Sequence, residues 1–68
     1  MFNVDDEVQI VDTTIYPMLK THTGIVRVAE PPNHIVDVAM YDVEIAGETY
    51  IFYHDELMLT SVAQIGAH

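Results

Sequence analysis

The chain has no cysteine, no tryptophan and only two basic side chains, Lys20 and Arg27, in 68 residues. The absence of cysteine excludes disulfide bonds, thiolate nucleophiles and cysteine-ligated zinc or iron–sulfur centres. A cysteine-free chain fits a cytoplasmic location, which we expect here. Two cations are too few to neutralise the phosphates of a nucleic acid or the surface of an anionic membrane. We therefore expect neither as a direct ligand.

Long apolar runs are missing as well. No stretch approaches the roughly 18–20 residues of a membrane-spanning helix, and the N-terminal segment 1–7 lacks the basic and apolar regions of a signal peptide. The four histidines stand apart, at His22, His34, His54 and His68. Because no HxH, HxxxH or HExxH spacing occurs, we expect no metal site. We also expect no cofactor and no enzymatic activity, since no glycine-rich phosphate loop or supported Ser–His pair is present.

Against these absences stand 11 Asp and Glu residues and a formal net charge of -9. A chain that was only acidic would be disordered. Half of this one is hydrophobic (50%), and its apolar residues form short runs typical of β-strands. A chain of this length makes one domain near the lower limit for independent folding, so a homodimer would add stability. The sequence therefore predicts a small β domain that binds a basic protein.

Five segments have the pattern of β-strands. The expected strands cover residues 7–12, 24–30, 35–45, 48–53 and 57–62. In the first strand, Val8 and Ile10 are expected to face the core. In the second, Val26 and Val28 are expected to face inward and Arg27 outward, because side chains alternate between the two faces of a strand.

The third expected strand changes phase along its length. Val36, Val38 and Met40 have one parity, whereas Val43 and Ile45 have the other. Regular pleating cannot bury both sets on one face. We therefore expect a β-bulge or a sharp bend near Tyr41-Asp42.

Turn residues predict how these segments are connected. Pro17 and several threonines indicate a long, ordered loop over 13–23. Ala46-Gly47 indicates a tight hairpin with positive φ at the glycine, and His54–Leu57 indicates a single 3₁₀ turn. We expect residues 1–62 to form one domain and residues 63–68 to fray.

Three motifs resemble those of small bacterial SH3-like domains. Phe2–Ile10 is similar to the opening F-x-V-G-D-x-V-x-V, His22–Val28 to x-x-G-x-V-x-x, and Tyr53–Leu57 to Y-x-x-E-L. The resemblance covers residues 2–60 and implies an all-β, five-stranded SH3-like barrel with a short 3₁₀ turn before the last strand. Asp5 replaces the family's glycine, which is tolerable because Asp visits left-handed conformations better than most residues. The fold carries many unrelated functions and by itself implies none.

The acidity resembles that of small phage-encoded inhibitors that imitate DNA and block the nucleic-acid-binding surface of a basic host protein. No residue pattern defines that group, so the candidate residues come from the carboxylates of this chain. Asp42 and Glu44 share a parity and are about 7 Å apart along a strand, a distance comparable with the phosphate spacing of one DNA strand. The expected partner-binding residues are Asp5, Asp6, Glu7, Asp42, Glu44, Glu48, Asp55 and Glu56.

Two other functions are compatible with the sequence. An SH3-like accessory subunit of a larger complex would dock through the apolar loop residues Ile15, Tyr16, Pro17, Met18 and Leu19. A reader of proline-rich peptides would need an aromatic groove, for which the candidates are Tyr16, Tyr41, Tyr50 and Tyr53. The carboxylates also have an ordinary interpretation, since charges at sheet edges block strand addition and keep a small protein soluble.

Overall fold

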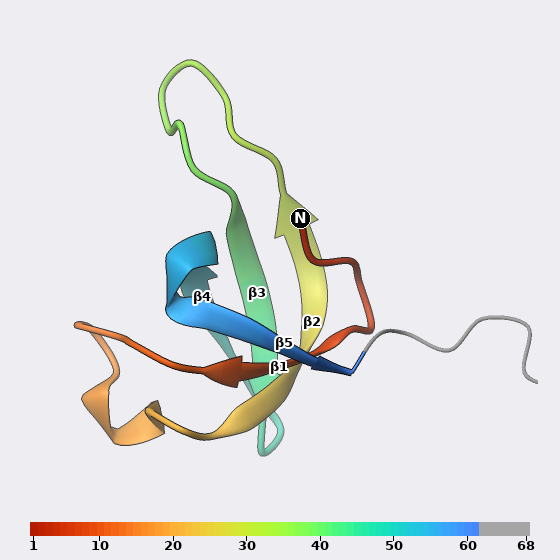
Figure 1. Ribbon diagram of the computed structural model, residues 1–68, viewed down its shortest axis with the longest axis vertical. Coiled ribbons are helices and arrows are strands. Elements are labelled where there is room, and N and C mark those ends of the chain that lie inside the picture. The colour runs from red at the N-terminus through yellow and green to blue at the C-terminus, as the bar shows by residue number, and fades with distance from the viewer. Residues whose placement is uncertain (62–68) are drawn as a thin grey trace, which may run out of the picture.

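The computed structural model describes residues 1–61, which form one five-stranded antiparallel sheet (Figure 1). The strands are β1 (Glu7–Ile10), β2 (Thr23–Glu30), β3 (Met40–Ile45), β4 (Glu48–Tyr53) and β5 (Leu57–Ser61), and the two 3₁₀ turns are η1 (Pro17–Leu19) and η2 (His54–Glu56). The strand order is β4-β3-β2-β1-β5. The all-β prediction is confirmed. The expected closed SH3-like barrel is not confirmed, because β4 and β5 are the two edges of an open sheet. The expected tail, 63–68, lies outside the described residues.

The core is built from side chains that alternate along the strands. Val8 and Ile10 of β1 and Val26 of β2 are completely buried, so their predicted inward directions are confirmed. Tyr41 of β3 and Phe52 of β4 are directly paired across the hairpin and are each only 1% exposed. Burying such a set of apolar side chains is the main favourable contribution to folding in a domain without disulfides.

A β-bulge lies in β2, where the sequence pattern had suggested none. Val26 pairs with Val43 of β3, but Val28 pairs with the next residue back, Asp42. Arg27 is therefore an extra residue with no partner of its own in β3, and the bulge reverses the facing of the strand beyond it. The prediction that Val28 faces inward is wrong, since this side chain is 43% exposed.

The prediction of a β-bulge or sharp bend near Tyr41-Asp42 is also wrong. β3 begins only at Met40 and alternates regularly to its end, with every second side chain buried. Val36 and Val38 precede the strand and belong to the loop 31–39. Their opposite parity therefore places no constraint on the pleating of β3.

Loop 31–39 connects β2 to β3 and projects from the sheet at the top of Figure 1. Asn33 organises this loop. Its N–H donates to the carbonyl of Val36 (2.7 Å), and its Oδ1 accepts hydrogen bonds from the N–H groups of Ile35 and Val36 (2.8 Å each). The turn presents Ile35, 81% exposed, to solvent.

The two remaining turns are confirmed. Ala46 and Gly47 have φ of 52° and 84°, which is the combination that a two-residue type I′ hairpin requires. The 3₁₀ turn η2 covers His54–Glu56 and leads directly into β5. Asp5 has φ of 78°, in the left-handed region that glycine adopts without cost.

Candidate protein-binding face

The carboxylates of the late hairpin lie on two different faces of the sheet. Asp42 and Glu44 are on the face of β3 opposite the core, as their shared parity predicts. Glu48 is paired with Ile45, whose side chain is buried. Directly paired residues of an antiparallel ladder project to the same side, so Glu48 lies at the hairpin end on the core side of the sheet. The structure therefore separates Glu48 from the other two.

The run Asp5-Asp6-Glu7 is also divided. Asp6 is 3% exposed, and its Oδ2 accepts a hydrogen bond from the N–H of Asn3 (2.8 Å). This carboxylate shapes the turn that leads into β1 and is not presented to a partner. Glu7 is half-buried and accepts a hydrogen bond from the hydroxyl of Thr60 on the edge strand β5 (3.1 Å). Of the three, only Asp5 is exposed, and its carboxylate pairs with Arg27.

The two acidic residues of η2 have different roles. Glu56 accepts a hydrogen bond from the N–H of Tyr53 through its Oε1 (2.8 Å), which satisfies a backbone donor where β4 ends. Asp55 is exposed and makes no ion pair within residues 1–61. Of the two, Asp55 is the one available to a partner.

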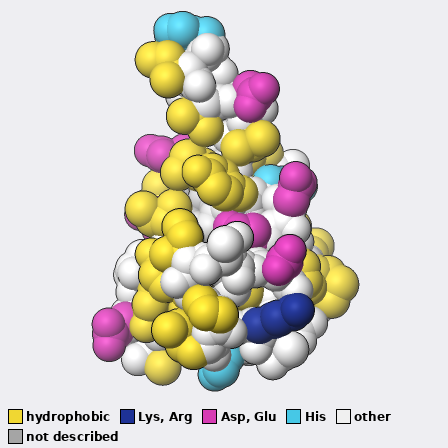
Figure 2. Space-filling model, turned by 90° about the vertical axis from the view of Figure 1, so that its left-hand side faces the viewer, with side chains coloured by type: hydrophobic (Ala, Val, Ile, Leu, Met, Phe, Trp, Pro, Cys, Tyr) yellow, Lys and Arg dark blue, Asp and Glu magenta, His cyan; other side chains and the backbone are white. Residues whose placement is uncertain are grey.

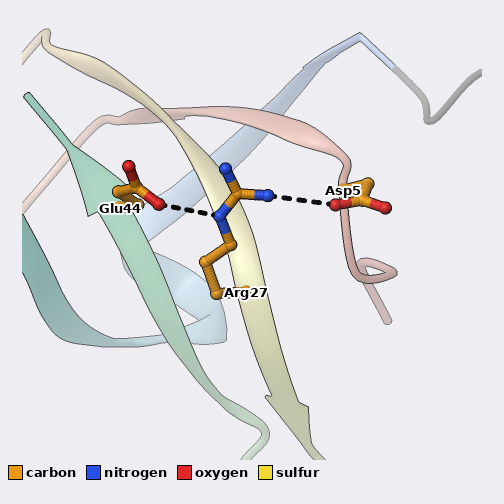
Figure 3. Close-up of polar contacts among 3 residues, drawn as sticks. All are labelled: Asp5, Arg27 and Glu44. Carbon is orange, nitrogen blue, oxygen red and sulfur yellow. Dashed lines mark hydrogen bonds and ion pairs between the residues drawn. The ribbon is translucent and has the colours of Figure 1, made fainter. Parts of the chain in front are cut away.

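Arg27 is held between two carboxylates (Figure 3). Its Nε donates to Oε1 of Glu44 (2.9 Å), and its Nη1 donates to Oδ1 of Asp5 (3.1 Å). The hydrogen bond that Arg27 donates to Glu44 is the main cause that raises the pKa of the Arg27 guanidinium. The three side chains are well exposed, so these ion pairs add little stability. Their main effect is to occupy one of the two basic side chains of the chain.

A mixed apolar and acidic surface covers the face of β2, β3 and β4 that points away from the core. We call it the outer-face patch and define it by Val28, Glu30, Met40, Asp42, Ile51 and Tyr53. Asp42 stands in one cross-strand row between Val28 and Ile51, which are 43% and 51% exposed. In the next row, Met40 stands between Glu30 and Tyr53. Carboxylates thus adjoin exposed apolar side chains, an association also visible on the side of the molecule drawn in Figure 2.

Glu30, which belongs to this patch, and Asp37, in the neighbouring loop 31–39, are not among the predicted binding residues. The expected strands 24–30 and 35–45 include these two residues without assigning either a role in binding. Both are exposed. The bulge at Arg27 sets which way Glu30 points, and the loop places Asp37 outside the sheet. Asp37 could have been found from Pro31-Pro32 and Asn33, which favour a loop over a strand.

The side chains proposed for the two alternative functions are distributed as follows. Tyr41 is 1% exposed, and Tyr16 and Tyr50 are half-buried with their rings in edge contact, 5.1 Å between centroids. Those three tyrosines therefore do not line one open groove with Tyr53. In the first loop, Ile15 and Met18 are exposed (69% each).

The described part of the chain contains no group of three or more His, Asp or Glu side chains that could hold a metal ion. His22, His34 and His54 lie on separate elements, and His68 is outside the described residues. Within residues 1–61, no helix has the length and apolar character needed to cross a membrane.

Comparison of the chain with models of protein families, with curated proteins and with solved structures found no match. Function is therefore inferred from the charge, exposure and position of the side chains described above.

Proposed function

We propose that this chain is a non-enzymatic, acidic protein-binding domain that docks through its outer-face patch on the nucleic-acid-binding surface of a basic protein. A phage-encoded DNA mimic acting in the cytoplasm of its host would work in this way. One observation carries the proposal. The chain has a net charge of -9, and Arg27, one of its two cations, is already engaged by Asp5 and Glu44. A typical soluble surface mixes both signs of charge.

The mechanism has two steps. The strong negative field first accelerates the encounter with a positively charged partner. Docking then buries the apolar side chains of Val28 and Ile51 and removes water from Asp42 between them. Removing water from a carboxylate costs free energy unless a cation pairs with it. The patch therefore favours partners that present a Lys or Arg side chain at this point.

The SH3-like fold belongs to the same proposal. It is supported by the long first loop with η1, the tight hairpin at Ala46-Gly47, and the one-turn η2 immediately before β5. The left-handed conformation of Asp5, at the glycine position of the opening motif, also supports it.

Capture of the partner tests the proposal. The full chain is immobilised and exposed to a lysate of the cells in which it is naturally made, and bound protein is eluted with a salt gradient. We expect a basic nucleic-acid-binding protein that elutes as salt rises, because salt screens exposed charges, and that duplex DNA displaces. Recovery of a salt-resistant complex that DNA does not displace would contradict the proposal.

A second candidate function is that of an apolar docking subunit of a larger complex. It is favoured by Ile15 and Met18, which are each 69% exposed in the loop around η1. Exposed apolar side chains of this size are typical of interaction sites when they cluster. If this function is correct, substituting both residues with serine should abolish capture at every salt concentration.

A further inference from the structure

Two pockets flank the base of loop 31–39. The first, of about 320 Å³, is lined by the polar residues Glu30 and Asn33 together with Pro31, Pro32, Val36, Val38 and Met40. The second, of about 290 Å³, is lined by Asp37 and Asp55 together with Met1, Pro32, Val38 and His54. Because Pro32 and Val38 line both, the two pockets are neighbours separated by one apolar wall. Glu30 and Met40 also belong to the outer-face patch, so the first pocket continues that surface.

Each pocket combines apolar walls with carboxylates that lack a cation. Among residues 1–61 the ion pairs are those of Arg27 with Asp5 and Glu44. Glu30, Asp37 and Asp55 take part in none of them. The first pocket is at the lower end of the roughly 300–1,000 Å³ typical of small-molecule sites, and the second is just below it. Pockets of this size suit a side chain better than a cofactor.

The second pocket has a firmly held wall. Nδ1 of His54 shares a hydrogen bond with the hydroxyl of the buried Tyr41 (2.9 Å), and that hydroxyl also accepts a hydrogen bond from the N–H of Phe2 (3.1 Å). The ring of Phe2 stacks on His54, with 4.7 Å between centroids. The imidazole is thus fixed on two sides, and a ligand would meet a preorganised surface, which lowers the entropy cost of binding.

We propose that the two pockets each bind a long basic side chain, and that the partner presents two Lys or Arg residues close together in one extended segment. The methylene stems would lie against Pro32 and Val38, as Lys and Arg stems commonly do on apolar surfaces. The charged heads would meet Glu30 in the first pocket and the pair Asp37 and Asp55 in the second. This inference rests on the proposed function, because it names the groups by which a basic partner is recognised.

The test is an NMR titration of the ¹⁵N-labelled full chain with an acetylated, amidated tripeptide that carries arginine at both ends and alanine between them. We expect saturable shifts of the backbone amides in loop 31–39 and η2. A tripeptide with norleucine in place of arginine keeps the apolar stems without the charge and should bind at least 5-fold more weakly. Glu30→Gln and Asp55→Asn should each weaken binding by about 2- to 5-fold, the effect of losing one exposed ion pair. The matched control Glu48→Gln should change it by less than 1.5-fold.

The outcomes separate this inference from the proposed function. Shifts confined to the centre of β3 and β4, or equal binding of the norleucine tripeptide, would overturn the assignment of the pockets and leave acidic docking intact. Absence of any shift would also overturn the assignment of the pockets. It would leave acidic docking intact, since capture of the partner tests that function independently. Binding in both pockets, together with failure to capture a basic nucleic-acid-binding protein, would support the pockets and reject the DNA-mimic function.

Discussion

Gly24→Ala is expected to lower the free energy of unfolding by about 3 kcal/mol, the upper part of the range for inserting a methyl group into a well-packed interior. An added Cβ would lie 2.6 Å from the backbone oxygen of Glu44 and 2.6 Å from Cγ1 of Ile45. The Glu44 oxygen belongs to β3 and cannot rotate away. The substitution would therefore push β2 away from β3, the two strands that carry most of the outer-face patch. Urea unfolding followed by circular dichroism measures the loss.

Gly47→Ala is the matched control for this prediction. A Cβ at this position meets nothing within 4 Å, so alanine would cause no clash. Because Gly47 has φ of 84°, alanine would still lower the free energy of unfolding by about 1–2 kcal/mol through its unfavourable backbone conformation. The first variant should therefore be the less stable one. If the alanine at position 24 were as well tolerated as that at position 47, the close approach of β2 to β3 would be refuted.

Tyr41→Phe is expected to destabilise the domain by about 1–3 kcal/mol, because it leaves polar groups without a partner. The hydroxyl of this residue, which is 1% exposed, joins Phe2 to His54. Its loss should also free the N–H of Phe2, which faster amide hydrogen exchange at that residue would report. Tyr50→Phe is the control, since the Tyr50 hydroxyl makes no hydrogen bond within residues 1–61. It should change stability by less than about 0.5 kcal/mol, and an equal loss in both variants would contradict the role of Tyr41.

Local patterns were enough to predict most elements of the fold. Val8 and Ile10 alternate with polar residues, so β1 and its inward face could be assigned directly. Ala46-Gly47 specifies its own turn, and β4 follows from it. The bulge could not be found in this way, because Val26-Arg27-Val28 has the alternation of a regular strand. What breaks that regularity is the pairing with β3, a segment far along the chain whose register no local pattern reveals.

The candidate site was harder to predict for similar reasons. Parity within one strand correctly places Asp42 and Glu44 on one face. The face of Glu48 depends instead on pairing across the hairpin, where its partner Ile45 puts it on the other side of the sheet. Asp6 is adjacent to two other acidic residues in the sequence, and only the three-dimensional structure shows that its carboxylate is buried. Charge composition thus predicted the character of the surface, whereas strand register decided which carboxylates share it.

The most direct test compares Asp42→Lys with Glu48→Lys in binding to the captured partner. Each substitution replaces one negative charge by one positive charge and so changes the net charge from -9 to -7. Asp42 lies within the outer-face patch, whereas Glu48 lies at the hairpin end on the other side of the sheet. If the patch docks the partner, Asp42→Lys should weaken binding at least about 10-fold, because a like charge would be desolvated against a basic surface, and Glu48→Lys should weaken it less than 3-fold. Equal losses in the two variants would contradict the account, since overall charge rather than the patch would then govern binding.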